Sequence, residues 1–107
     1  MTVSLPAPVQ TLLDAANAGD IDAFLAGMTA DGVVDDWGRK FLGPAAIRAW
    51  SDGEFIGVRV SLAPTSVTDK DGEHVVTAIV GGDGFNGPSH FAFRIDGSPV
   101  SRMTIRA

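Results

Sequence analysis

Two consecutive aspartates, Asp35 and Asp36, are the first candidates for proton chemistry in this sequence. They follow Val33 and Val34, whose branched side chains predict a short strand that ends near Trp37. Successive side chains of a strand point to opposite faces, so only one of the two carboxylates can face a pocket. A carboxylate that is partly withdrawn from water can serve as a general base. The alternative is that both aspartates end a strand in solvent.

His90 is the second candidate proton carrier. It precedes Phe91 and Phe93, which alternate as in a strand that lines a pocket. Because imidazole titrates near neutral pH, His90 could donate to a substrate oxygen or relay a proton to Asp36. The alternative is a hydrogen-bonded residue at the edge of the sheet. The other histidine, His74, stands at the start of a predicted strand, and we expect it to be exposed.

Aromatic side chains supply candidate walls for an apolar pocket. We select Trp37 and Trp50, together with Phe91 and Phe93, as the candidate substrate-binding residues. Ordinary core packing is the alternative for each of them. Walls of this kind suit a small, flat and apolar ligand.

The composition argues against several classes of function. The chain has no cysteine and only two histidines, which are far apart in sequence, so we expect no metal site and no cofactor. The net charge of −5 argues against nucleic acid and against an anionic membrane as partners. No apolar run approaches the roughly 20 residues that span a bilayer. We therefore expect a soluble, cytoplasmic protein.

The elements that must position these residues begin with helices. Apolar residues at helical spacing predict a helix over 7–18 and a second one that reaches Met28. Gly19 and Asp20 separate the two, because glycine commonly ends a helix and aspartate caps the start of the next. A third helix begins at Pro44, since proline is favoured at the first helical position.

Strand periodicity takes over from Val58. Alternating apolar residues predict a half-buried strand that starts there and a final strand through Met103 and Ile105. Residues 75–80 are apolar at both parities, which predicts a central strand covered on both faces. Helices grouped before strands indicate an α+β fold, and the length suits one domain over residues 1–107.

Four motifs in this order resemble the nuclear transport factor 2-like superfamily, and its SnoaL-like and ketosteroid-isomerase-like branches in particular. The motifs are Gly19-Asp20-Ile21-Asp22-Ala23, Val34-Asp35-Asp36, Gly43-Pro44-Ala45-Ala46-Ile47, and Phe85-Asn86-Gly87 followed by His90-Phe91-Ala92-Phe93. The resemblance implies three N-terminal helices packed in a strongly curved, mainly antiparallel sheet, which together form a cone with an apolar pocket. It also implies a homodimer joined through the outer face of the sheet.

The resemblance further implies a role for one of the aspartates. It places Asp36 at the position of the general base of the isomerases, which moves a proton beside a carbonyl. The isomerases hold the oxyanion with a tyrosine and a protonated aspartic acid. This sequence has no tyrosine and has Phe91 where the second acid would fall, so we do not expect steroid isomerisation.

We therefore predict a small-molecule-binding domain of the SnoaL-like type. Its predicted chemistry is that of a proton-transfer isomerase, cyclase or dehydratase acting on an apolar carbonyl compound, with Asp36 as base and His90 as helper. The alternative is a non-catalytic ligand-binding or dimerisation module.

Overall fold

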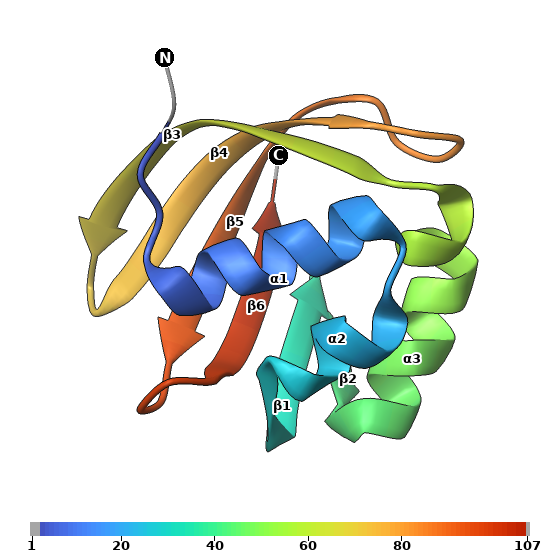
Figure 1. Ribbon diagram of the computed structural model, residues 1–107, viewed down its shortest axis with the longest axis horizontal. Coiled ribbons are helices and arrows are strands. Elements are labelled where there is room, and N and C mark those ends of the chain that lie inside the picture. Colours follow the sequence, from blue (N-terminus) through green and yellow to red (C-terminus); the bar gives the residue numbers. More distant parts are fainter. Residues whose placement is uncertain (1–2, 107) are drawn as a thin grey trace.

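The strands of this chain form one curled sheet around three α-helices (Figure 1). The computed structural model describes residues 3–106, so residues 1, 2 and 107 of the predicted domain lie outside the described part. The helices are α1 (Ala7–Ala18), α2 (Ile21–Ala26), α3 (Gly43–Glu54) and the short 3-10 helix η1 (Ile56–Val58). The strands are β1 (Met28–Asp36), β2 (Arg39–Leu42), β3 (Ser61–Lys70), β4 (Glu73–Gly81), β5 (Gly87–Ile95) and β6 (Val100–Arg106).

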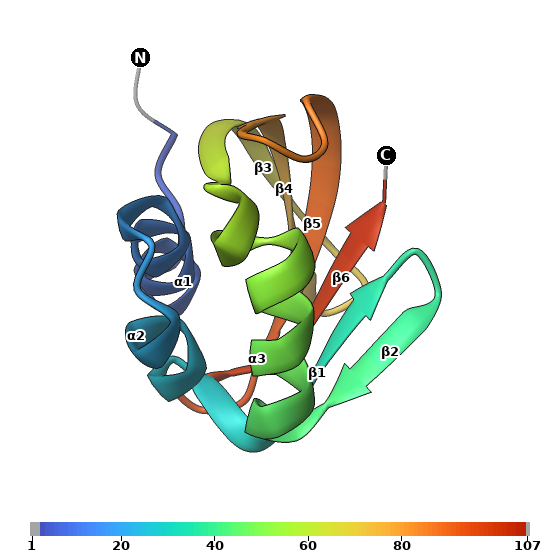
Figure 2. The same cartoon turned by 90° about the vertical axis from the view of Figure 1, so that its right-hand side faces the viewer.

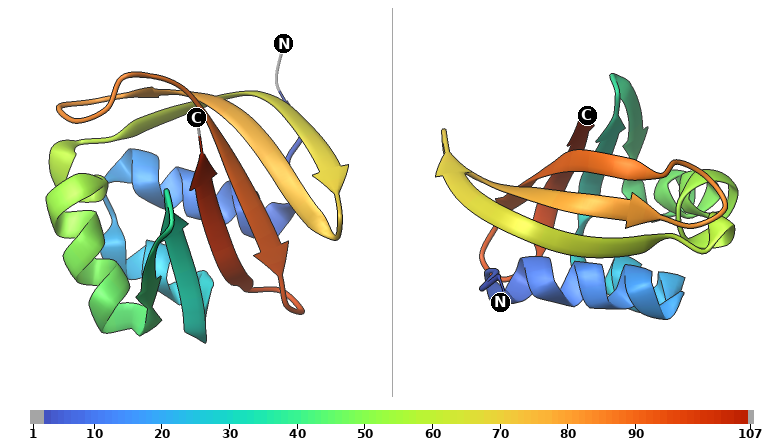
Figure 3. Two further views of the ribbon diagram at one scale, coloured as in Figure 1. Left: turned by 180° about the vertical axis from the view of Figure 1, so that it is seen from behind. Right: turned by 90° about the horizontal axis from the view of Figure 1, so that it is seen from above.

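The order of strands in the sheet is β2-β1-β6-β5-β4-β3. All neighbours are antiparallel except β1 and β6, which run parallel. The sheet bends over α1, and α3 lies beside β1 and β2 (Figure 2). The views from behind and from above show that the sheet curls without closing (Figure 3). The predicted α+β fold with helices inside a curved sheet is confirmed.

The first two helices form for the reasons that the sequence indicates. The buried face of α1 includes its predicted apolar residues, Val9, Leu12, Leu13 and Ala16. The helix ends at Gly19, whose φ of 71° is left-handed and suits glycine. The Asp20 carboxylate then accepts a hydrogen bond from the Ala23 N–H and caps α2. In residues 3–106, no helix is long and apolar enough to cross a membrane.

Two predicted boundaries are wrong. The second helix ends before Met28, which starts β1 instead, because the Gly27 carbonyl accepts a hydrogen bond from the Val100 N–H and leads the chain into the sheet. Val58 lies in η1 and not in a strand, because the chain turns at Arg59, where φ is 56°. Strand β3 starts only after this turn.

The predicted cover on both faces of residues 75–80 is also wrong. Val76 and Val80 are buried on the inner face of β4, but Ile79 on the outer face is 48% exposed. In the described part of the chain, the helices pack on the inner face alone (Figure 3). Both faces of β4 are apolar in sequence, and the tertiary structure covers one of them.

Candidate functional site

An open pocket of about 410 Å³ lies between α3, η1 and the inner face of the sheet. This volume lies within the range typical of small-molecule sites. Its walls are mostly aromatic and aliphatic, with the charged side chains gathered at one end. The aromatic lining residues are Trp37, Trp50, Phe55, Phe85 and Phe91, and the polar side chains are Asp36, Arg39, Glu54 and Ser89.

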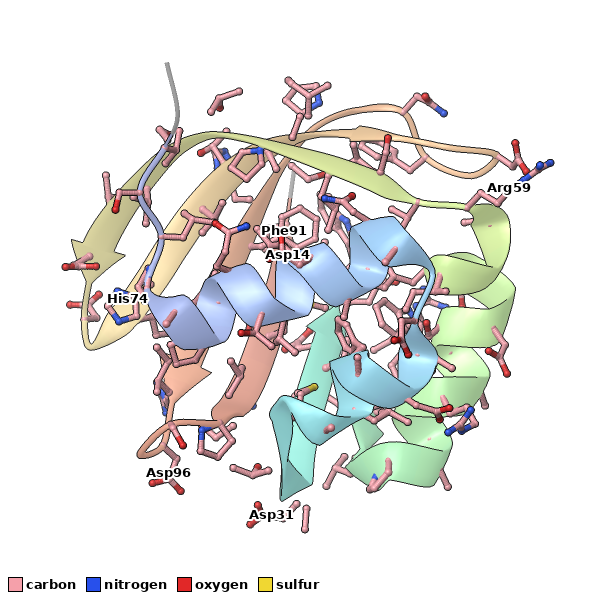
Figure 4. All side chains as sticks on the ribbon, viewed as in Figure 1. Asp14, Asp31, Arg59, His74, Phe91 and Asp96 are labelled. Carbon is pink, nitrogen blue, oxygen red and sulfur yellow. The ribbon has the colours of Figure 1, made fainter. Side chains whose placement is uncertain are left out.

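Four of the six predicted site residues meet at this pocket. Asp36 and Trp37 come from the end of β1 and the turn after it, Trp50 comes from α3, and Phe91 comes from β5. Phe91 lies in the interior behind α1 (Figure 4). The sequence thus placed residues from three separate segments in one site.

The other two predicted residues lie elsewhere. Phe93 is fully buried in the core and does not line the pocket. His90 is exposed on the outer face of the sheet, where its Nδ1 lies 2.9 Å from Thr77 Oγ1. The alternation of β5 explains this position, because the residues that flank His90 point inward. His74, at the edge of the molecule, contacts Asp69 at 2.6 Å (Figure 4).

The carboxylate of Asp36 is held through one of its two oxygens. Oδ2 accepts hydrogen bonds from Trp50 Nε1 at 3.1 Å and from Arg39 Nη2 at 2.6 Å. The side chain is 16% exposed, and within residues 3–106 no hydrogen bond reaches Oδ1. Donors on one oxygen orient the carboxylate, and the second oxygen keeps its acceptor capacity for a ligand.

Arg39 links Asp36 to Glu54 across the polar end of the pocket. Its Nη1 lies 3.0 Å from Glu54 Oε2, and its Nη2 lies 2.7 Å from Oε1, which is a two-pronged contact. The hydrogen bonds with Glu54 and then Asp36 raise the pKa of the Arg39 guanidinium, and the same contact lowers the pKa of Glu54. Two carboxylates and one guanidinium leave this end with one net negative charge. Since Arg39 and Glu54 are about half exposed, water screens the pair, and its main effect is orientation.

A stack of three aromatic rings fixes the direction of the Trp50 N–H. The ring of Trp50 lies between Phe41, 6.0 Å away, and Phe55, 4.9 Å away, with interplanar angles of 29° and 22°. Trp50 is 4% exposed, so packing holds its indole in one orientation. The carboxylate that receives the indole N–H is therefore held by a rigid donor.

Sequence reasoning missed three of the polar residues. Arg39 pairs with Asp36 across the β1–β2 hairpin, and this pairing depends on the register of the two strands. Glu54 ends α3, and its contact with Arg39 depends on how that helix meets the hairpin. Ser89 could have been found, because it shares the parity of Phe91 on the same strand. In residues 3–106, no group of histidine and acidic side chains could hold a metal ion.

Asp35 lies on the opposite face of β1 and has structural partners. It is 3% exposed and accepts hydrogen bonds from Arg102 at 2.9 Å, Arg106 at 3.1 Å and the Gly38 N–H at 2.8 Å. The pKa of the Asp35 carboxyl lies below its ordinary value of 3.8, mainly because Arg106 donates to it. Burial opposes this effect, and Gly38 and the charges of the two arginines add to it. This arrangement separates the roles of the two aspartates.

We expect Asp35→Ala to lower the free energy of unfolding at pH 7 by about 2–3 kcal/mol, because it leaves two arginines without their shared partner. A pKa lowered in the folded state means that the stabilisation is present above pH 3.8 and is lost as the pH falls below it. Urea unfolding at pH 7 and pH 3 measures both effects, and the gap between wild type and variant should narrow at pH 3. The exposed Asp31→Ala, on the same strand, is the control and should change stability little.

Trp37 occupies a strained position at the rim of the pocket. Trp37 and Gly38 have φ of 56° and 88°, the positive values that a two-residue type I′ hairpin requires at both positions. Asparagine is favoured at the first position, and a bulky residue there is uncommon. The indole is 60% exposed and yet lines the pocket.

We expect Trp37→Asn to raise the free energy of unfolding by about 1 kcal/mol and to weaken ligand binding. Asparagine tolerates the left-handed backbone, and the exposed indole loses little buried area. Thermal unfolding and titration with an aromatic ketone measure the two effects. Trp37→Phe, which keeps a ring at the same backbone position, should retain more of the binding and gain no stability.

The pocket, the three helices and the curled sheet define a nuclear transport factor 2-like domain. Within this class, the SnoaL-like domain family matches residues 9–104, and the chain belongs to that family. A comparison with curated proteins gave no match.

Solved structures resemble the chain over nearly its whole length. A candidate polyketide cyclase from Sinorhizobium meliloti has 26% sequence identity and a TM-score of 0.82, with 95% of each chain covered. A protein of ketosteroid isomerase-like fold from Catenulispora acidiphila, in complex with trimethylamine, has 20% identity and a TM-score of 0.80, with 97% of this chain and 87% of that chain covered. A computationally designed 17-OHP binder has 19% identity and a TM-score of 0.79, with 94% and 87% covered. At their lower identities, the last two show a common fold alone.

Proposed function

We propose that the pocket binds a small, largely apolar carbonyl compound and that Asp36 takes a proton from the carbon beside the carbonyl. The reaction would be an isomerisation, an aldol-type cyclisation or a dehydration. The observation that carries the proposal is the Asp36 carboxylate in an aromatic wall, anchored through Oδ2 and, among residues 3–106, without a partner at Oδ1.

The proposed step begins with the transfer of a proton from the substrate carbon to Asp36 Oδ1. The electron pair of the broken C–H bond moves to the carbonyl, which becomes an enolate oxygen. Trp50 and Arg39 keep the carboxylate in place during the transfer. The enolate needs positive charge or hydrogen-bond donors nearby, and the guanidinium of Arg39 lines this pocket. Return of the proton to a different atom completes an isomerisation.

The comparisons support the proposal in a general way. The candidate polyketide cyclase and the 17-OHP binder have names that refer to carbonyl-containing or steroid-like molecules. The predicted helper role of His90 has no such support, because its side chain lies on the outer face of the sheet. The proposal therefore depends on Asp36 and its two anchoring residues.

Deuterium exchange into 2-tetralone tests the proposal without knowledge of the natural substrate. This flat two-ring ketone has exchangeable protons beside its carbonyl, and proton NMR in D₂O measures their loss. We expect the protein to accelerate the exchange about 10²-fold over buffer, the lower end of what a positioned general base contributes. Binding without acceleration would favour the second candidate, a non-catalytic ligand-binding module. The missing tyrosine and second acid are the observations that favour this alternative.

We also propose that a second copy of this chain covers the outer face of the sheet. That face carries Ile79, which is 48% exposed, beside the half-buried Val75 and Thr77 of β4. Sedimentation velocity at micromolar concentration should then show a species with twice the mass of one chain. Ile79→Lys should shift it to the mass of one chain, and a monomeric wild type would contradict the proposal.

A further inference from the structure

We propose that Ser89 is a second polar anchor of the pocket, and that the ligand carries a hydroxyl group at the end remote from Asp36. This inference deepens the proposed function, because it specifies the class of carbonyl compound that the same pocket takes. The ligand is then a hydroxylated ketone or aldehyde with an apolar middle, bound in one direction.

Ser89 interrupts an otherwise apolar surface. The inward-facing residues that follow it on β5 are Phe91 and Phe93, and those of the neighbouring β4 include Ala78 and Val80. Ser89 is 4% exposed and lines the pocket. A polar side chain in this position contributes nothing to apolar packing that alanine would not contribute.

The hydroxyl of Ser89 is available to a ligand. Within residues 3–106, no side-chain hydrogen bond involves its Oγ, although the side chain is almost completely buried. In the described part of the chain, Thr29 Oγ1 is the only fully buried polar side-chain atom without a hydrogen-bond partner. Ser89 Oγ is therefore not fully buried, and it keeps contact with the pocket. Because solvent can reach this hydroxyl through the pocket, a ligand that displaces the solvent loses affinity unless one of its own atoms pairs with the hydroxyl.

Strand register gives the separation of the two polar anchors. Asp36 pairs with Ile105 on β6, and Ile105 pairs with Phe91 on β5, so Asp36 and Phe91 are two strands apart. Ser89 lies two residues farther along β5. With strand spacings near 4.8 Å and a rise near 3.3 Å per residue, the Cα atoms of Asp36 and Ser89 are roughly 12 Å apart. Because both side chains point into the pocket, the distance between their oxygen atoms is shorter than this Cα separation and is about the length of a two-ring molecule.

The walls between the two anchors are apolar. Val80 and Phe91 come from β4 and β5, and Val60 comes from the link between η1 and β3. Phe55, just after α3, and Phe85, in the β4–β5 loop, complete the apolar lining. An apolar channel with one hydrogen-bonding group at each end fixes the direction of a ligand that has polar atoms at both of its ends. Such sites discriminate well against analogues that lack one polar group, because the bound analogue leaves a polar group of the protein buried and unpaired.

The test compares 2-tetralone with 6-hydroxy-2-tetralone, which adds one hydroxyl on the ring remote from the carbonyl. Dissociation constants come from quenching of tryptophan fluorescence, for wild type, Ser89→Ala and the control Ser66→Ala, which lies exposed on β3. We expect wild type and Ser66→Ala to bind the hydroxylated ketone about 3- to 10-fold more tightly than the plain one, the range of one ordinary hydrogen bond. Ser89→Ala should bind the two equally.

Deuterium exchange into plain 2-tetralone separates this inference from the proposed function. Wild type and the control Ser66→Ala should exchange plain 2-tetralone at the same rate, because the exposed Ser66 lies outside the pocket. If wild type shows no exchange but prefers the hydroxylated ketone in a Ser89-dependent manner, the proposed chemistry fails and the anchor stands. Equal affinity of wild type for the two ketones, or a preference that Ser89→Ala retains, would overturn the inference.

Discussion

Asp36→Asn is expected to lower the protein-catalysed exchange of 2-tetralone about 10²-fold, to the rate of buffer alone. An amide has nearly the shape of a carboxylate but cannot take the proton. Its oxygen can still accept hydrogen bonds from Trp50 and Arg39, so the fold and the pocket should persist. NMR measures the exchange rate, and tryptophan fluorescence measures the dissociation constant. We expect the affinity of this variant for 2-tetralone to change little.

Asp31→Asn is the matched control for this variant. Asp31 lies on the same strand but is exposed and outside the pocket. The Asp31→Asn variant should catalyse deuterium exchange into 2-tetralone at the wild-type rate. Wild-type exchange by Asp36→Asn would show that another group takes the proton, and Glu54→Gln would then be the next variant to measure.

Phe93→Ala is expected to lower the free energy of unfolding by about 3–5 kcal/mol, a large fraction of the total stability of a small domain. Phe93 has no exposed surface and lies among core residues, including Met103, its paired residue on the neighbouring strand β6. Removal of the ring leaves a cavity that the packed core cannot fill. Urea unfolding measures the loss, and Phe93→Leu, with a smaller cavity, provides a folded variant if the alanine variant does not fold.

The affinity of the folded protein for 2-tetralone should not change in Phe93→Leu. Phe91→Leu is the matched comparison, because Phe91 is two residues away on the same face but lines the pocket. It should lose binding as well as stability. Loss of binding in Phe93→Leu as large as in Phe91→Leu would contradict the distinction between core and site.

Local sequence signals were enough to predict where the α-helices lie and to which class the fold belongs. Apolar spacing and the Gly19-Asp20 pair predict the end of α1 and the start of α2, because a left-handed glycine and a side-chain cap act within a few residues. The start of α3 follows from Pro44 in the same way. Met28 and Val58 were misplaced because hydrogen bonds and turns that involve distant residues decide where those elements end.

The separation of the two aspartates was also within reach of the sequence. Strand alternation sends Asp35 and Asp36 to opposite faces, and the resemblance to the isomerases selects Asp36. The same alternation turns His90 away from the face of Phe91 and turns Ser89 toward it. Alternation within one strand therefore carries more information about this site than residue chemistry alone.

The sequence by itself determined the α+β class, the approximate positions of the helices, and that only one of the two adjacent carboxylates can face the pocket. Only the tertiary structure decided that Arg39 and Trp50 meet on one oxygen of Asp36, that Glu54 holds Arg39, and that Asp36 and Ser89 line one pocket. The physical reason is the distance along the sequence between the residues that interact. Caps and periodicity act between residues a few positions apart, whereas these contacts depend on how α3 and the β1–β2 hairpin pack and on which strands become neighbours in the sheet.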